Sequence, residues 1–123
     1  MGEIVLELPR PPSANHRYVR RRDGRLALTT EARDYDVVVY AALGPRRPQV
    51  PRGAPVSIRV DLAVDHWRRR DLDNVLKQLI DSLARVLGFD DADVVRIEAT
   101  KRLERGNEGV VVVLSWGGGN AGR

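Results

Sequence analysis

An alternating aliphatic segment followed by an amphipathic one limits this chain to folds in which a helix packs on a sheet. Between residues 56 and 64 every second residue is aliphatic, which is the period of a strand with one buried face, and the strand is expected to run to about His66. From about Asn74 to Leu87 apolar residues recur at helical spacing, with Asp73 as a suitable N-cap and Gly88 as the expected end. The apolar stripe of this helix comprises Val75, Leu76, Leu79, Ile80, Leu83, Val86 and Leu87.

A second helix is predicted ahead of this unit. Thr29 or Thr30 can cap it, and it runs from about residue 31 to residue 43. We expect its inward face to consist of Tyr35, Val38, Val39 and Ala42. The residues before it, 9–28, contain several prolines and an Asp-Gly turn, so they predict a basic loop.

Three further strands complete the predicted fold. They lie at residues 3–8, 95–99 and 109–116, and the turn at 104–108 is expected to join the last two as a hairpin. The order of elements is then β-α-β-α-β-β. This order predicts an α+β fold: a single two-layer domain at residues 1–116, with a mixed four-stranded sheet and two helices, followed by a flexible tail at residues 117–123.

Size and composition exclude several classes of protein. A chain of 123 residues is of single-domain size, and with no cysteine it has neither disulfides nor thiolate ligands. No apolar run approaches the roughly 20 residues that span a bilayer, so no membrane partner is expected. The first residues are too acidic for a signal peptide. We therefore expect a cytoplasmic protein.

The basic residues are almost all arginine and lie in clusters. The net charge is +4 with a sequence pI near 10.1, and only Lys77 and Lys101 are lysine. Arginine pairs with phosphate oxygens through two parallel hydrogen bonds, so clustered arginine is typical of nucleic-acid binders. Basic surface runs are also often only solubilising, and charge alone leaves both interpretations open. The clusters are Arg17, Arg20, Arg21, Arg22 and Arg25; Arg46, Arg47 and Arg52; and Arg68, Arg69 and Arg70.

A group of charged residues surrounds the start of the helix predicted from about Asn74 to Leu87. Asp71 and Asp73 lie where a strand gives way to the helix, and Lys77 follows one turn later. Carboxylates suit Mg²⁺, which beside a phosphate activates water and neutralises developing charge, and a lysine adds positive charge there. Asp90 and Asp91 follow the helix, and they approach the other carboxylates only if the next strand runs back beside the strand that ends at Asp71. The alternative is an N-cap, a helical ion pair from Lys77 to Asp81, and an acidic turn.

The pattern of residues resembles the RusA family of Holliday-junction resolvases. The matching strings are Arg-Arg-Arg-Asp-Leu-Asp-Asn-x-x-Lys at residues 68–77, Asp-Ser-Leu at 81–83 and Gly-x-Asp-Asp at 88–91. Pro-Pro-Ser-x-Asn at residues 11–15, with a basic stretch before the first helix, extends the likeness over most of the chain. The linker at 45–55 and the glycine-rich tail do not follow the family pattern.

This resemblance implies a homodimeric, Mg²⁺-dependent endonuclease that cuts four-way DNA junctions by paired symmetric nicks in recombination and repair. Mn²⁺ is a possible substitute, and no organic cofactor is expected. The implied metal ligands are Asp71, Asp73 and Asp91, with Asp90 as the substitute for Asp91, and the implied catalytic lysine is Lys77. Two other functions stay open at this point: a non-catalytic nucleic-acid-binding module, and a metal-dependent nuclease for flaps or other branched DNA. The residues expected to contact DNA are Asn15, Arg17, Arg20, Arg21, Arg22, Arg68, Arg69 and Arg70.

Overall fold

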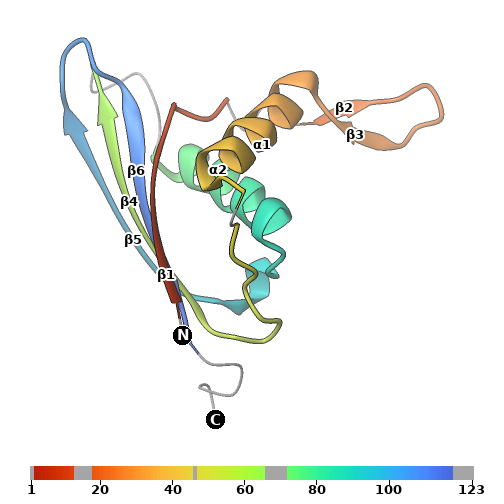
Figure 1. Cartoon of the computed structure of the whole chain (residues 1–123). Helices are drawn as coiled ribbons and strands as arrows, with labels where there is room; N and C mark the ends of the chain where they lie inside the picture. The colour runs from red at the N-terminus through yellow and green to blue at the C-terminus, as the bar shows by residue number, and fades with distance from the viewer. Residues whose placement is uncertain (1, 13–17, 46, 66–71, 118–123) are drawn as a thin grey trace.

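The protein is a two-layer α+β domain in which one face of a mixed sheet is covered by two helices (Figure 1). The computed structural model describes residues 2–12, 18–45, 47–65 and 72–117. No helix in these ranges is long and apolar enough to cross a bilayer. The elements are β1 (Gly2–Leu8), β2 (Tyr18–Arg20), β3 (Leu26–Leu28), α1 (Thr30–Leu43), β4 (Val56–Val64), α2 (Leu72–Leu87), the 3-10 turn η2 (Asp91–Asp93), β5 (Val94–Leu103) and β6 (Gly109–Trp116).

The four long strands form one sheet in the order β1-β6-β4-β5. β6 is antiparallel to both of its neighbours, whereas β4 and β5 are parallel, so the predicted mixed sheet is confirmed. The predicted hairpin of the last two strands is wrong, because β4 lies between β5 and β6. β5 is therefore an edge strand, and its side chains are far more exposed than those of the central strand β4.

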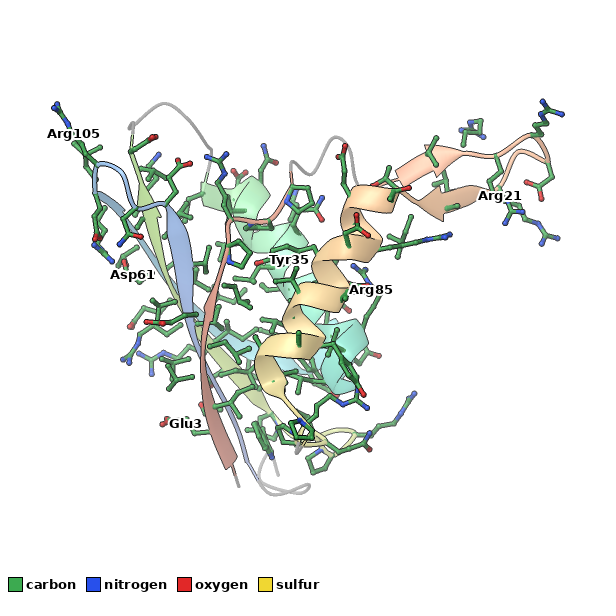
Figure 2. All side chains as sticks on the ribbon, turned by 45° about the horizontal axis from the view of Figure 1, so that its top comes forward. Glu3, Arg21, Tyr35, Asp61, Arg85 and Arg105 are labelled. Atoms are coloured by element: carbon green, nitrogen blue, oxygen red, sulfur yellow. The ribbon has the colours of Figure 1, made fainter. Side chains whose placement is uncertain are left out.

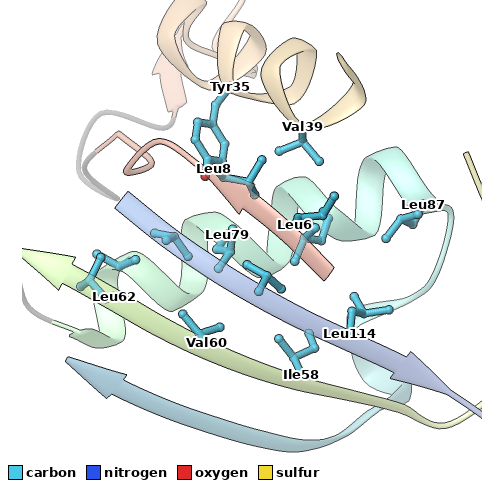
Figure 3. Packing of buried hydrophobic residues seen from close by; sticks show 14 of the residues in the cluster. Leu6, Leu8, Tyr35, Val39, Ile58, Val60, Leu62, Leu79, Leu87 and Leu114 are labelled. Carbon is cyan, nitrogen blue, oxygen red and sulfur yellow. The ribbon is translucent and has the colours of Figure 1, made fainter. Parts of the chain in front are cut away.

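The core lies between the sheet and α2. Alternate residues of β4 point at the helix, and Ile58, Val60 and Leu62 are almost completely buried there. Leu79 and Leu83 of α2, at the centre of the stripe that the sequence predicts, belong to the same cluster, and Figure 3 shows Leu79 facing the sheet. Gln78 and Ser82 of the same helix are also buried, and the hydroxyl of Ser82 faces α1, where it donates a hydrogen bond to Asp36. The strand and the helix that the sequence predicts most clearly, β4 and α2, thus form the centre of the fold.

The first helix packs on α2 and β1 through a narrower face than expected. Thr29 is its N-cap, since its Oγ1 accepts a hydrogen bond from the Ala32 N–H, and Gly44 at φ 77° ends it. Tyr35 and Val39 are buried as predicted. The predicted burial of Val38 and Ala42 is wrong: α1 contacts the body on one side only, and both residues are exposed.

Tyr35 fastens α1 to the end of the first strand. Its hydroxyl donates a 2.8 Å hydrogen bond to the carbonyl oxygen of Pro9, and burial raises the pKa of this phenol well above its usual value. A buried phenol with its donor satisfied stays neutral. Tyr35 is therefore a structural residue of the helix–sheet contact.

A short hairpin replaces part of the basic loop predicted at residues 9–28. β2 pairs antiparallel with β3, with Val19 opposite Ala27 and Arg20 opposite Leu26. The sequence shows little alternation here because neither face of the hairpin is buried in the core. In Figure 1 the hairpin extends outward beyond the N-terminal end of α1.

Candidate active site

A groove runs between α2 and the edge strand β5. It has a volume of about 420 Å³ and an apolar floor to which Leu76, Ile80 and Ile97 contribute. It exists because β5, at the edge of the sheet, is only partly covered by α2. The charged residues that line it are Asp73, Lys77, Asp81 and Asp91.

The helix spacing places Asp73, Lys77 and Asp81 in this groove. They follow one another at intervals of four residues along α2, so they form a row beside the buried stripe. Asp73 is not the N-cap that the sequence predicts, because α2 begins at Leu72 and Asp73 lies within its first turn. Its Oδ1 accepts the Asn74 N–H at 3.0 Å, and its side chain remains exposed. Its other oxygen can therefore reach a ligand.

Lys77 is an exposed cation in the middle of the row. Among the described residues it forms no ion pair, so the Lys77–Asp81 pair of the alternative interpretation is not formed. Asp73 precedes it and Asp81 follows it along the groove wall. An ammonium group held in this position on a helix can meet a phosphate oxygen that enters the groove.

Asp90 and Asp91 take different positions in the acidic turn. Asp90 caps η2: its Oδ1 accepts the Ala92 N–H at 2.9 Å. This hydrogen bond, together with one from Asp91, lowers the pKa of Asp90. The side chain of Asp91 lines the groove, whereas Asp90 lines only a neighbouring hollow of about 470 Å³. Asp90 thus has a structural role, and Asp91 is the carboxylate available to the groove.

A backbone contact holds the acidic turn in place. The Oδ2 of Asp93 accepts the Gly53 N–H at 3.1 Å, which ties the turn to the proline-rich linker before β4. Arg52 from the same linker lines the neighbouring hollow and favours the ionised form of Asp90. The sequence gives no signal for this contact, because the residues lie 40 positions apart.

The carboxylates of Asp73 and Asp91 lie at opposite ends of the groove. Asp73 is in the first turn of α2, and the turn that carries Asp91 follows the last. The sequence-based prediction that brings them together requires the strand after the acidic turn to run antiparallel to β4, so that its start would lie near the end of β4. This condition is not met. β5 is parallel to β4, so Val94 pairs with Val56 at the start of β4 rather than at its end. Asp81, two turns and roughly 12 Å beyond Asp73, lies between them.

The described part of the chain contains no cluster of three side chains able to hold a metal ion. Asp71 directly precedes α2 and lies outside the described residues, as do Asn15, Arg17, Arg68, Arg69 and Arg70. Their predicted roles stay predictions. Arg20, Arg21 and Arg22 are described, and all three are exposed on the hairpin.

The chain is similar to the members of a known protein family. The family described as endodeoxyribonuclease RusA matches residues 9–115, a range that includes the groove, both helices and the hairpin. This chain belongs to the RusA family. The resemblance in the sequence is thereby confirmed.

RusA relatives match over most of their length. The chain is 36% identical to the crossover junction endodeoxyribonuclease RusA of Escherichia coli (strain K12) over 103 residues, 82% of this chain and 84% of that protein. It is 37% identical over the same shares to the enzyme of the same name from Enterobacteria phage 82. The corresponding protein of Enterobacteria phage HK97 is 34% identical over 102 residues.

Proposed function

We propose that this RusA-family chain is a Mg²⁺-dependent endodeoxyribonuclease that resolves four-way DNA junctions by paired symmetric nicks. The observation that carries the proposal is the groove, which presents Asp73, Lys77 and Asp91 on one surface of a RusA-family fold. The relatives named above are crossover junction endodeoxyribonucleases. We also place its activity in the cytoplasm, in recombination and repair.

Membership in the family implies a divalent metal, and the chemistry of the groove suits one. Its exposed carboxylates are hard oxygen ligands, which Mg²⁺ prefers, and Mn²⁺ accepts the same donors. In the proposal Asp71, Asp73 and Asp91 hold the ion. When bound, the ion activates water and neutralises negative charge that develops on the phosphate.

Lys77 has a separate role in the proposal. Its ammonium group binds a non-bridging or leaving oxygen of the scissile phosphate and stabilises the additional negative charge of the transition state. Lys77 thereby acts on the substrate, whereas the carboxylates act on the ion.

We further propose that the active form is a homodimer in which each site combines residues of both subunits. Two ligands of one Mg²⁺ must lie within about 4 Å of each other, since each bond is about 2.1 Å long. Asp73 and Asp91 lie at opposite ends of one groove, whereas a two-fold axis across the groove brings the Asp91 end of one subunit toward the Asp73 end of the other. Two such sites match the approximate two-fold symmetry of a four-way junction.

A cleavage assay tests the function. The purified protein is incubated with a labelled four-way junction, a flap and a plain duplex, in Mg²⁺ or in EDTA, beside Asp73→Asn. We expect paired symmetric nicks on the junction alone, abolished by EDTA and by the substitution. Binding without cleavage in any metal would leave only a nucleic-acid-binding module. Equal cutting of flaps would indicate a broader nuclease of branched DNA.

A further inference from the structure

The hairpin formed by β2 and β3 carries a concentrated positive charge away from the body of the protein. Arg20, Arg21, Arg22 and Arg25 lie at or beside its tip, accompanied by the single carboxylate of Asp23. In Figure 2 the side chains of this tip, with Arg21 labelled, extend into open space far from the sheet. Within the described ranges no carboxylate forms an ion pair with any of these arginines. They are therefore available to an anionic partner.

The tip is held in one conformation by its own hydrogen bonds. The Arg21 N–H donates to the carbonyl oxygen of Arg25 at 2.8 Å, and the Gly24 N–H donates to that of Arg21 at 3.0 Å. Gly24 has φ +83°, a conformation that other residues rarely adopt. The side chain of Asp23 accepts the Arg25 N–H at 3.0 Å, so the one acidic residue is used to shape the turn. The arginines are thus presented on a preformed ribbon and little order is lost when they bind.

The hairpin also exposes apolar side chains that pack on nothing in the body. Val19 is 52% exposed and Leu26 is 64% exposed, and they lie on opposite faces of the ribbon. A single exposed aliphatic residue needs no explanation. Here two exposed aliphatic residues lie on strands of only three residues each, next to arginines. The edges of the hairpin can therefore bind an anion, while its faces can contact apolar groups.

We infer that this hairpin is a DNA-binding arm that enters the major groove of one duplex arm of the junction, an inference that rests on the proposed function. A two-stranded ribbon fits the major groove, about 12 Å wide, and not the minor groove, about 6 Å wide. The arginines of the tip contact phosphates on both walls of the groove. The face that carries Leu26, the more exposed of the two aliphatic residues, meets the base edges, where thymine methyl groups are apolar, and Val19 lies on the opposite face. These contacts recognise no particular base sequence, so the hairpin binds any DNA duplex of the junction. Selection of the junction over plain duplex depends on the rest of the protein.

Two triple variants of equal charge test the arm. One changes Arg21, Arg22 and Arg25 to Gln, and leaves the hairpin hydrogen bonds intact because none of them uses the side chains of these three residues. The matched control changes Arg59, Arg96 and Arg105 to Gln. Arg59 and Arg96 lie on strands β4 and β5, and Arg105 lies in the turn between β5 and β6, away from the hairpin (Figure 2). Both lower the net charge by the same amount. Binding to a labelled junction is measured in EDTA over a series of salt concentrations, with thermal melting to verify folding.

We expect the hairpin variant to bind roughly tenfold or more weakly and to lower the slope of log affinity against log salt by between about 2 and 3, since each lost phosphate contact contributes about 0.9. The control should change the slope by less than about 1. Dimethyl sulfate methylates guanine N7 in the major groove. The wild-type protein and the control variant should protect guanines in one duplex arm of the junction from this methylation, and the hairpin variant should not. Equal weakening by the two variants, or protection confined to adenine N3 in the minor groove, would overturn the inference.

The same variants separate this inference from the proposed function. If the wild-type protein cuts no DNA in Mg²⁺, the proposed function fails, while the binding and protection data still decide whether the arm exists. If it cuts, the hairpin variant should require more protein for half-maximal cleavage but should retain a rate within about threefold of wild type at saturation. A lower cleavage rate of the hairpin variant at saturation, with unchanged junction affinity, would also contradict a hairpin whose role is limited to DNA binding.

Discussion

The position of Lys77 on α2 makes its contribution separable from that of the carboxylates. We expect Lys77→Met to reduce the single-turnover nicking rate about 100-fold or more, because one fixed cationic partner of the transition state is removed. Junction affinity should change little, and Lys77→Arg should recover part of the rate. Lys77 is exposed, so the melting temperature should stay close to that of the wild type. A rate within a few-fold of wild type for Lys77→Met would remove this residue from the mechanism.

The two adjacent aspartates of the acidic turn should respond oppositely to substitution. Asp91→Asn should abolish cleavage with little effect on stability, because its carboxylate lines the groove. Asp90→Ala should retain cleavage but lower the melting temperature, since Asp90 caps η2.

The stability effect of Asp90 should depend on pH in a defined direction. The folded-state pKa of Asp90 is lowered, so its ionised form stabilises the fold above the unfolded pKa of about 3.9, and this stabilisation is lost as the pH falls through the lower folded value. The difference in melting temperature between the wild type and Asp90→Ala should therefore be full at neutral pH and should shrink below about pH 4. A difference that is constant down to pH 2 would contradict this role.

At the level of single residues the sequence predicts part of the site. The spacing of Asp73 and Lys77 follows from helical geometry alone, and both line the groove. Neither spacing nor resemblance distinguishes Asp90 from Asp91, because adjacent residues of a turn can exchange roles with a one-residue shift. Only the cap hydrogen bond to Ala92 assigns Asp90 to the turn.

One carboxylate of α1 accepts hydrogen bonds from two side chains of α2. Asp36 of α1 accepts a 2.5 Å hydrogen bond from the hydroxyl of the buried Ser82 and two hydrogen bonds from Arg85, at 2.7 and 3.0 Å. We expect Asp36→Ala to lower the free energy of unfolding by about 1–3 kcal/mol, because Ser82 loses its acceptor in a buried position. Urea unfolding measures the change. Asp34→Ala is the control on the same helix, and it should have an effect below about 0.5 kcal/mol because Asp34 is exposed.

The error in strand pairing has a physical cause. Strands that are consecutive in the chain usually pair, which favours a hairpin of β5 with β6. β6, however, is rich in valine on both faces and is half-buried or buried throughout, so it needs a partner on each side. β5 carries Arg96, Glu98 and Arg102, and such charged strands are typical of sheet edges. Composition of the two strands, more than their order, indicates which one is central.

The short hairpin of β2 and β3 could not be predicted by the same reasoning. Alternation indicates a strand only where one face is buried, and the residues of this hairpin are largely exposed. Its one local signal is Asp23-Gly24, which the sequence identifies as a turn but not as the tip of a ribbon.

For the whole molecule, the decisive question is whether each site takes residues from two subunits. We expect Asp73→Asn and Asp91→Asn to be inactive separately and to regain activity when they are mixed and allowed to exchange subunits. In a mixed dimer with shared sites, one site keeps both carboxylates, so the junction should be nicked on one strand without paired resolution. If each site belonged to a single subunit, every site in the mixture would lack one ligand, and the mixture would remain inactive.

The central place of β6 in the sheet also has a consequence for how the protein forms. β1 has β6 as its sheet neighbour, with Gly2 opposite Trp116, so β1 can pair only after this much later segment of the chain has been synthesised. Before that, β4 and β5 can pair around α2, because they are close in the chain, but the edge of β4 that β6 later covers stays open. Contacts of such long sequence separation slow folding. A nascent or truncated chain that ends before residue 109 would therefore leave one edge of β4 unpaired and β1 without its partner, and be prone to aggregation.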